Sequence, residues 1–129
     1  MVDDDPDDIF ITKALCKRAP VPIEFMGLSS GDALFEFIKN NGVDPIDLIL
    51  LDVLMPKDSG YDVVNKMRAS PLTADVTIVM FSGVSHPHQK KLALDLGAND
   101  FLLKPVSAEQ EKIFFDLLSE RHRHCKTGK

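Results

Sequence analysis

Polar residues stand where the apolar stretches of this sequence end. Asp52 closes the run D-L-I-L-L-D, Ser82 follows T-I-V-M-F, and Lys104 follows D-F-L-L. Three consecutive aspartates, Asp3–Asp5, lie close to the start of the chain. Carboxylates that are brought together repel one another and raise each other's pKa unless a cation joins them. These residue types could therefore hold a divalent cation beside a reactive carboxylate.

Magnesium suits such a group, because it prefers hard oxygen ligands and is often held by one or two carboxylates together with a phosphate. A carboxylate can also attack phosphorus and become an aspartyl phosphate. A lysine and a hydroxyl group would then stabilise the charged oxygens of the transferred group. Aspartates, a serine and a lysine at one edge of a sheet thus indicate phosphoryl-transfer chemistry.

The elements that would position these residues follow from the apolar pattern. Short β-rich runs alternate with amphipathic stretches, as in a parallel sheet with crossover helices. We predict strands at Ile23–Leu28, Asp47–Asp52, Thr77–Phe81 and Phe101–Lys104. In open α/β sheets, ligands bind beyond the carboxyl ends of the strands. The polar residues at the ends of these runs are therefore the candidates for a functional site.

Five helices are predicted around these strands. They start at Pro6, after a Ser30 cap, before Val63, at His88 and after a Ser107 cap. The segment Met55–Gly60 is expected to be a turn. A clean (βα)5 order needs one further strand at the start, where Met1 and Val2 alone precede the aspartates. We therefore expect a truncated first strand and further residues upstream of Met1.

Length and composition limit the function classes. The chain has 129 residues, which is enough for one domain. Its 15 basic and 20 acidic side chains give a net charge of −5, which argues against direct nucleic-acid binding. The longest apolar run is far too short for a membrane span. Cys16 and Cys125 have neither zinc-site nor disulfide-scaffold spacing, so we expect a reducing, cytoplasmic setting.

Four short motifs occur in order along the chain. They are V-D-D at Val2–Asp4, L-L-D-V-L-M-P at Leu50–Pro56 with Gly60 after it, F-S-G at Phe81–Gly83 and L-K-P at Leu103–Pro105. Together they resemble the receiver domain of two-component response regulators, similar to the stand-alone chemotaxis (CheY-like) type, from Val2 to about Ser119. The resemblance implies a flavodoxin-like (βα)5 three-layer sandwich with a parallel sheet of order 2-1-3-4-5.

The resemblance also implies a role for each residue of the site. Asp52 is the phosphoacceptor, and Mg²⁺ is held by Asp3, Asp4, Asp52 and the backbone carbonyl of Leu54. Ser82 and Lys104 contact the phosphoryl group, and the Lys104–Pro105 bond is expected to be cis. Phe101 is the aromatic switch residue, which turns inward when Ser82 moves.

Two features of this sequence qualify that assignment. The triple aspartate leaves Asp4 and Asp5 as an alternative metal pair, although we prefer Asp3 and Asp4 because Val2 should end the first strand. Leu54 and Val84, which in this family influence dephosphorylation, are both apolar. Neither can orient an attacking water, so we predict slow self-hydrolysis of the aspartyl phosphate.

The resulting functional hypothesis is a phosphorylation-dependent switch without enzymatic activity of its own. A sensor histidine kinase or a histidine phosphotransfer protein would phosphorylate Asp52 and change a partner-binding face at about His88–Leu118. We expect a receiver domain at 1–121 and a short basic tail at 122–129. The partner would be an unknown protein target or, after phosphorylation, a second copy, with no nucleic acid and no membrane. The chain could also be a receiver excised from a larger regulator or hybrid kinase.

The sequence also permits three other interpretations. Each polar residue alone is more simply a turn, a helix start or a surface charge, and only the joint pattern favours a site. An aspartyl-phosphate phosphatase or phosphotransferase usually carries an acid/base Asp two residues after the nucleophile, where this chain has Leu54. A flavodoxin-like electron carrier would share the fold, but no loop resembles a phosphate cradle for flavin.

Overall fold

The computed structural model describes residues 1–55, 59–83 and 86–127. Their elements are α1 (Pro6–Lys17), α2 (Gly31–Asn41), β1 (Ile49–Asp52), α3 (Gly60–Ala69), β2 (Ile78–Ser82), α4 (Pro87–Leu96), β3 (Asp100–Leu103) and α5 (Ala108–Thr127). The alternation of strands and helices confirms the predicted α/β class. Among these residues, no helix is both long enough and apolar enough to span a membrane.

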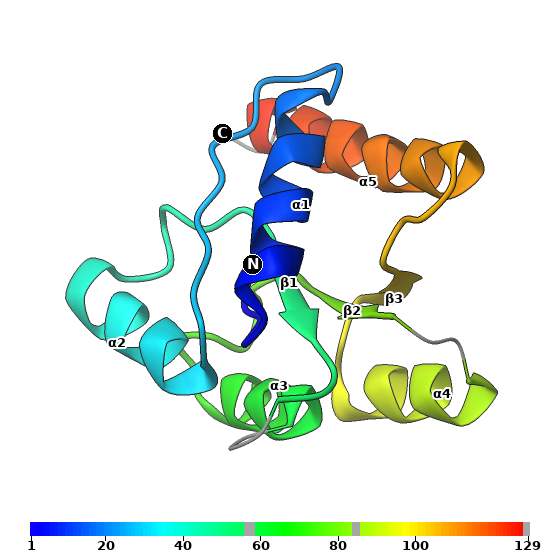
Figure 1. Ribbon diagram of the computed structural model, residues 1–129. Helices are drawn as coiled ribbons and strands as arrows, with labels where there is room; N and C mark the ends of the chain where they lie inside the picture. Colours follow the sequence, from blue (N-terminus) through cyan, green and yellow to red (C-terminus); the bar gives the residue numbers. More distant parts are fainter. Residues whose placement is uncertain (56–58, 84–85, 128–129) are drawn as a thin grey trace.

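The sheet is parallel, with β2 between β1 and β3 (Figure 1). Two isolated parallel bridges extend it, because Val2 pairs with Leu51 on one side and with Leu28 on the other. The Val2 amide donates to the carbonyl of Leu50 at 2.8 Å, and the Asp52 amide donates to the carbonyl of Val2 at 2.9 Å. Val2 thus takes the place of a first strand, and with both bridges the order is 2-1-3-4-5, as predicted.

The predicted strand Ile23–Leu28 is wrong, because only its last residue forms a bridge. Leu28 donates to the carbonyl of Met1 at 2.8 Å and accepts from the amide of Asp3 at 3.0 Å. A regular strand needs a partner along its whole length. A cavity of about 320 Å³, lined in part by Ile23–Met26, lies beside the rest of this segment, and the segment forms no bridge before Leu28 in the described structure.

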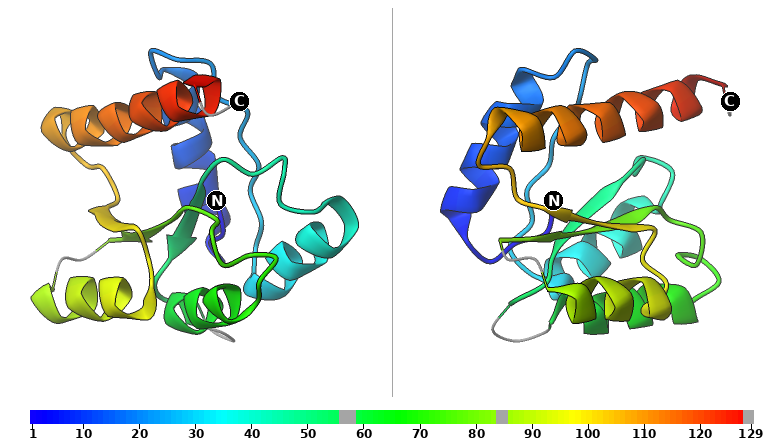
Figure 2. Two further views of the ribbon diagram at one scale, coloured as in Figure 1. Left: turned by 180° about the vertical axis from the view of Figure 1, so that it is seen from behind. Right: turned by 90° about the vertical axis from the view of Figure 1, so that its right-hand side faces the viewer.

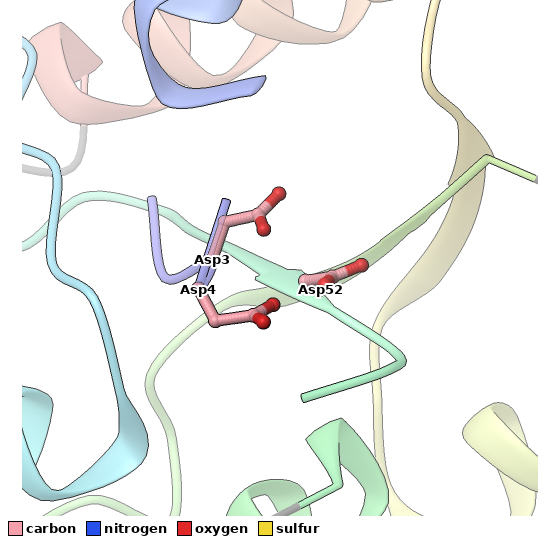
Figure 3. A group of neighbouring side chains, drawn as sticks. All are labelled: Asp3, Asp4 and Asp52. Carbon is pink, nitrogen blue, oxygen red and sulfur yellow. The ribbon is translucent and has the colours of Figure 1, made fainter. Parts of the chain in front are cut away.

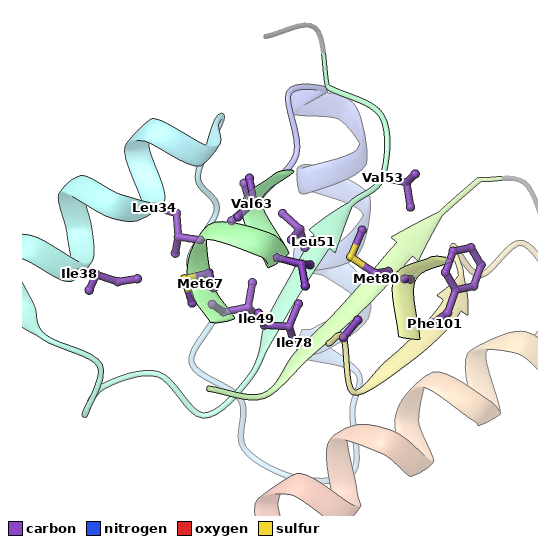
Figure 4. Close-up of a cluster of buried hydrophobic side chains, with 14 residues drawn as sticks. Leu34, Ile38, Ile49, Leu51, Val53, Val63, Met67, Ile78, Met80 and Phe101 are labelled. Atoms are coloured by element: carbon purple, nitrogen blue, oxygen red, sulfur yellow. The ribbon is translucent and has the colours of Figure 1, made fainter. Parts of the chain in front are cut away.

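Helices cover both faces of the sheet. α1 and α5 lie on one face, and α2, α3 and α4 lie on the other (Figures 1 and 2). Successive strand residues point to opposite faces, so Leu50 packs with the α1 and α5 side whereas Leu51 packs with the α2, α3 and α4 side (Figure 4). Every residue of β1 and β2 is buried. This three-layer arrangement explains why these strands read as continuous apolar runs.

Short polar side chains fix the helix starts. Ser30 accepts a hydrogen bond from the Ala33 amide at 3.0 Å, and Ser107 accepts one from the Gln110 amide at 3.2 Å, as the sequence predicted. Gly60 is the first residue of α3 and not part of a turn, since Ser59 caps this helix. Residues 56–58 of the expected turn lie outside the described residues.

Arg68 connects several segments near the amino-terminal ends of β2 and β3. Its guanidinium donates to the carbonyls of Gly97, Ala74 and Val76 at 2.8, 3.0 and 2.8 Å, and to Oδ1 of Asn99 at 2.9 Å. It therefore joins the end of α3, the segment before β2 and the turn before β3. A lysine offers no comparable planar set of donors.

Replacement of Arg68 should destabilise the fold. Arg68→Ala leaves several carbonyls without their charged donor, and we expect the free energy of unfolding to fall by about 2–3 kcal/mol. Arg68→Lys should recover only part of this loss. Urea denaturation measures both variants, with exposed Lys66→Ala on the same helix as the control. An Arg68→Ala protein as stable as the control would contradict this role.

Candidate functional site

The carboxyl ends of the strands meet at one edge of the sheet. Asp52 is the last residue of β1, Ser82 is the last residue of β2, and Lys104 follows directly after β3. The register aligns these ends, because Asp52 pairs with Phe81 and Ser82 pairs with Leu103. The Lys104 amide donates to the carbonyl of Ser82 at 2.7 Å. The sheet thus brings together the three polar residues that the sequence singled out.

An acidic group lies at this edge. Asp3, Asp4 and Asp52 each offer one carboxylate oxygen, and these atoms lie within 4.8 Å of one another (Figure 3). Asp3 is fully buried and Asp52 is 7% exposed, whereas Asp4 is exposed. Hard oxygen donors that converge in this way fit Mg²⁺ or Mn²⁺. The structure therefore assembles the side chains that the sequence predicted as metal ligands.

Asp5 is placed differently from its two neighbours. Its side chain caps α1 by accepting a hydrogen bond from the Asp7 amide at 2.9 Å. Its own amide donates to Oδ1 of Asp3, also at 2.9 Å. Among the described residues, Asp5 does not belong to the convergent acidic group. This arrangement favours Asp3 and Asp4 over the alternative pair Asp4 and Asp5.

The ammonium group of Lys104 reaches three carboxylates. Its Nζ atom lies 2.9 Å from Oδ2 of Asp3, 2.7 Å from Oδ2 of Asp8 and 3.3 Å from Oδ1 of Asp52. Asp8 is a further residue of the site that the sequence motifs do not include. The signal that could have revealed it is the position of Pro6 at the helix start, since a helix that begins directly after the acidic loop keeps its first turn beside that loop.

Burial and neighbouring charges set the protonation of the site. Burial raises the pKa of Asp52 from 3.8 to about 6; Lys104 opposes this shift, whereas Asp3 and Asp4 add to it. Burial lowers the pKa of Lys104, but its hydrogen bonds to Asp8 and Asp3 and the charge of Asp52 outweigh burial and raise it above its ordinary value. At pH 7 the predominant state is an ionised Asp52 beside a protonated Lys104.

The remaining predicted residues lie around this edge. Ser82 is buried at the end of β2. Phe101 of β3 is 8% exposed and already packs in the apolar cluster with Met80, its partner on β2 (Figure 4). Leu54, two residues after Asp52, exposes 66% of its surface. The metal-binding role of its carbonyl stays a prediction, and Val84 lies outside the described residues.

Two backbone features adjoin Asp52 and Lys104. The Gly60 amide donates to the carbonyl of Val53 at 2.9 Å, and a Cβ atom at Gly60 would overlap the carbonyl oxygen of Asp52. Only glycine allows α3 to start this close to the end of β1.

The expected cis bond between Lys104 and Pro105 is wrong, because the described chain has no cis peptide bond. The trans form is the one generally favoured before proline.

Neutralising Asp52 should stabilise the metal-free protein. A pKa raised from 3.8 to about 6 means that the folded state favours the protonated carboxyl, so ionisation costs stability as the pH rises from 3.8 through 6. We expect Asp52→Asn to raise the free energy of unfolding by about 1–2 kcal/mol at pH 7, with little effect at pH 4. Urea denaturation in a chelator tests this, with exposed Asp44→Asn as the control. A loss of stability at pH 7 would contradict it.

Comparisons with known proteins agree with this geometry. Residues 1–113 match the response regulator receiver domain family. A probable cyclic di-GMP phosphodiesterase of Vibrio cholerae serotype O1 is 35% identical over 108 residues, which are 83% of this chain and 23% of that protein. The gliding motility regulatory protein of Myxococcus xanthus is 31% identical over 104 residues, 81% of this chain and 13% of that protein. The chain therefore spans only a small part of these relatives.

Solved structures show the same fold. A putative response regulator from Chloroflexus aurantiacus J-10-fl is 26% identical, with a TM-score of 0.77 and coverage of 94% of this chain and 93% of that one. The Mn²⁺-bound form of the response regulator Rcp1 is 22% identical, with a TM-score of 0.74 and coverage of 92% and 88%. With its sequence match, its CheY-like fold and its acidic group at the carboxyl edge of the sheet, the chain belongs to the response regulator receiver domain family.

Proposed function

We propose that this chain is a phosphoacceptor switch in a two-component phosphorelay, with Asp52 as the residue that is phosphorylated. The observation that carries this proposal is that the Asp52 carboxylate lies next to two other carboxylates and an ammonium group. Carboxylate oxygens of Asp3 and Asp4 converge with one of Asp52, and the Lys104 ammonium lies 3.3 Å from Oδ1 of Asp52. This arrangement offers a nucleophile, a place for a divalent cation and a cation of the protein itself.

The phosphoryl donor would be a phosphohistidine of a sensor histidine kinase or of a histidine phosphotransfer protein. An oxygen of Asp52 attacks phosphorus, the new O–P bond forms and the P–N bond of the donor breaks. The imidazole leaves with the electron pair and takes up a proton. Lys104 then donates to a phosphoryl oxygen, and the Ser82 hydroxyl lies at the same edge to contact another.

The cofactor in this proposal is Mg²⁺. Asp3, Asp4, Asp52 and the backbone carbonyl of Leu54 would hold Mg²⁺, which would neutralise charge on the phosphoryl oxygens. The support for it is the donor set, because three carboxylates offer the oxygen ligands that Mg²⁺ prefers. Without a cation these carboxylates repel one another and the incoming phosphoryl group.

Phosphorylation would be communicated through β2 and β3 to a partner-binding face at about His88–Leu118. Ser82 ends β2, and Phe101 of β3 packs beside β2, so a movement of Ser82 could reach α4 and α5 through this pair of strands. The partner would be a downstream protein or a second phosphorylated copy, in the cytoplasm, without direct contact to nucleic acid or membrane. Since the relatives are much longer, a receiver at 1–121 within a larger regulator is the alternative setting.

An enzymatic role as an aspartyl-phosphate phosphatase is less well supported. Such a mechanism needs an acid/base carboxylate two residues after the nucleophile. The exposed, apolar side chain of Leu54 occupies that position. A signalling switch without its own catalytic turnover fits the site better.

Phosphorylation of Asp52 can be tested by intact mass. After incubation with Mg²⁺ and acetyl phosphate or phosphoramidate, we expect the protein to gain one phosphoryl group. Asp52→Asn should show no gain, and neither should the wild type in a chelator. Exposed Asp44→Asn should behave as the wild type. Labelling of the Asp52→Asn protein, or a folded wild type that gains no mass, would refute the proposal.

The aspartyl phosphate should be long-lived, because the exposed Leu54 side chain cannot orient a water molecule for attack. Leu54→Glu would place a carboxylate there, and we expect loss of the phosphoryl group to be at least about tenfold faster. Leu72→Glu, at another exposed leucine, is the matched control. The decay of the phosphorylated mass after removal of the donor measures the rate. Rapid loss from the wild type, or no acceleration in Leu54→Glu, would contradict this prediction.

A further inference from the structure

The ammonium group of Lys104 donates hydrogen bonds to Asp8 and Asp3 in this structure and forms an ion pair with Asp52. It carries three N–H donors, and three carboxylates surround it. Asp8 lies at 2.7 Å, Asp3 at 2.9 Å and Asp52 at 3.3 Å from Nζ. Phosphorylation of Asp52 adds anionic oxygens that compete with Asp8 and Asp3 for Lys104.

Asp8 differs from the other two partners of Lys104. It lies in the first turn of α1 and outside the acidic group that could hold a cation. Its side chain is 33% exposed, whereas that of Asp3 is fully buried and that of Asp52 is 10% exposed. Asp3 also accepts a hydrogen bond from the Asp5 amide at 2.9 Å, which holds it in place.

These differences decide which contact can be released at the lowest cost. A carboxylate that leaves Lys104 must find other partners, and a buried one would remain without them. Asp8 can turn into water, whereas Asp3 cannot. Asp52 itself stays within reach because it bears the new group. Of these carboxylates, Asp8 is therefore the one that can leave Lys104 at the lowest cost.

We infer that Asp8 is a positioning residue that holds Lys104 in the unphosphorylated state and gives it up to a phosphoryl oxygen when Asp52 is phosphorylated. This inference rests on the proposed function of Asp52. Breaking a hydrogen bond between two charged groups opposes phosphorylation. Asp8 thus sets a threshold for the switch, although it takes no part in the chemistry of transfer.

Neutralising Asp8 should accelerate phosphorylation. In Asp8→Asn, Lys104 keeps Asp3 and Asp52 but loses its charged partner on α1, so a phosphoryl oxygen no longer has to displace that partner. At equal concentrations of Mg²⁺ and acetyl phosphate, we expect the rate of mass gain to rise about tenfold. This factor corresponds to the lower end of the free energy that a hydrogen bond to a charged group typically contributes. Asp8→Glu keeps the charge and should restore a rate close to that of the wild type.

Two controls separate this role from a general effect of charge. Asp7→Asn removes the same charge from the exposed neighbouring residue in the same helical turn, and should change the rate little. In a Lys104→Met background, Asp8→Asn should have no further effect. Circular dichroism establishes that each variant is folded.

The outcomes distinguish this inference from the proposed function. If the wild type gains no phosphoryl group, the proposed function fails. If the wild type is phosphorylated but Asp8→Asn is unchanged or slower, the role of Asp8 is refuted and the proposed function stands. An equal acceleration in Asp7→Asn, or one that persists without Lys104, would also overturn the role of Asp8.

Discussion

A single ammonium group, that of Lys104, compensates the charges of several carboxylates at the carboxyl edge of the sheet. Asp3 has no exposed surface and Asp52 has very little, so their charges cannot rely on water. An unpaired ion in such a place costs several kcal/mol, and breaking a buried pair is correspondingly destabilising. Lys104 lies within 3.3 Å of both carboxylates. Since Lys104 follows β3 directly, the register of β3 on β2 and of β2 on β1 decides whether this compensation is available.

The fold supplies that register through residues that are far apart in the sequence. Asp3 is held by the two bridges of Val2, which lies between Leu28 and β1. Lys104 is held by the hydrogen bond from its amide to Ser82, at the end of the strand beside β1. In the unfolded chain Asp3 and Lys104 are separated by almost the whole domain, and their charges do not meet. The ion pairs of the site therefore form only when the strands of the sheet pair.

The sequence predicted those parts of the structure in which a local pattern and a tertiary contact agree. The buried strands read as apolar runs ending at Asp52 and Ser82, and the serine caps of α2 and α5 lie where capping chemistry places them. The segment Ile23–Leu28 has strand-like residues but lacks a partner along its length, and this depends on a neighbouring segment and not on its own composition. Asp8 is not predicted from the sequence for a similar reason. Its contact with Lys104 joins a helix to a strand end, and the only signal for it in the sequence is that α1 begins at Pro6, directly after the acidic loop.

The excess of acid at this edge couples the binding of cations and anions. Asp3, Asp8 and Asp52 contact the ammonium group of Lys104, and Asp4 lies beside Asp3 and Asp52, so carboxylates outnumber the cation here and leave an excess of negative charge. That charge attracts a divalent cation and repels a phosphoryl donor of like sign. In the proposed function, a bound cation would reduce the repulsion, and a phosphoryl group on Asp52 would in turn add ligands for the cation. Because such coupling is reciprocal, each should raise the affinity for the other. Under the proposed function, the surplus carboxylates would make phosphorylation depend on the cation, because Lys104 alone would leave the site too acidic to accept an anion.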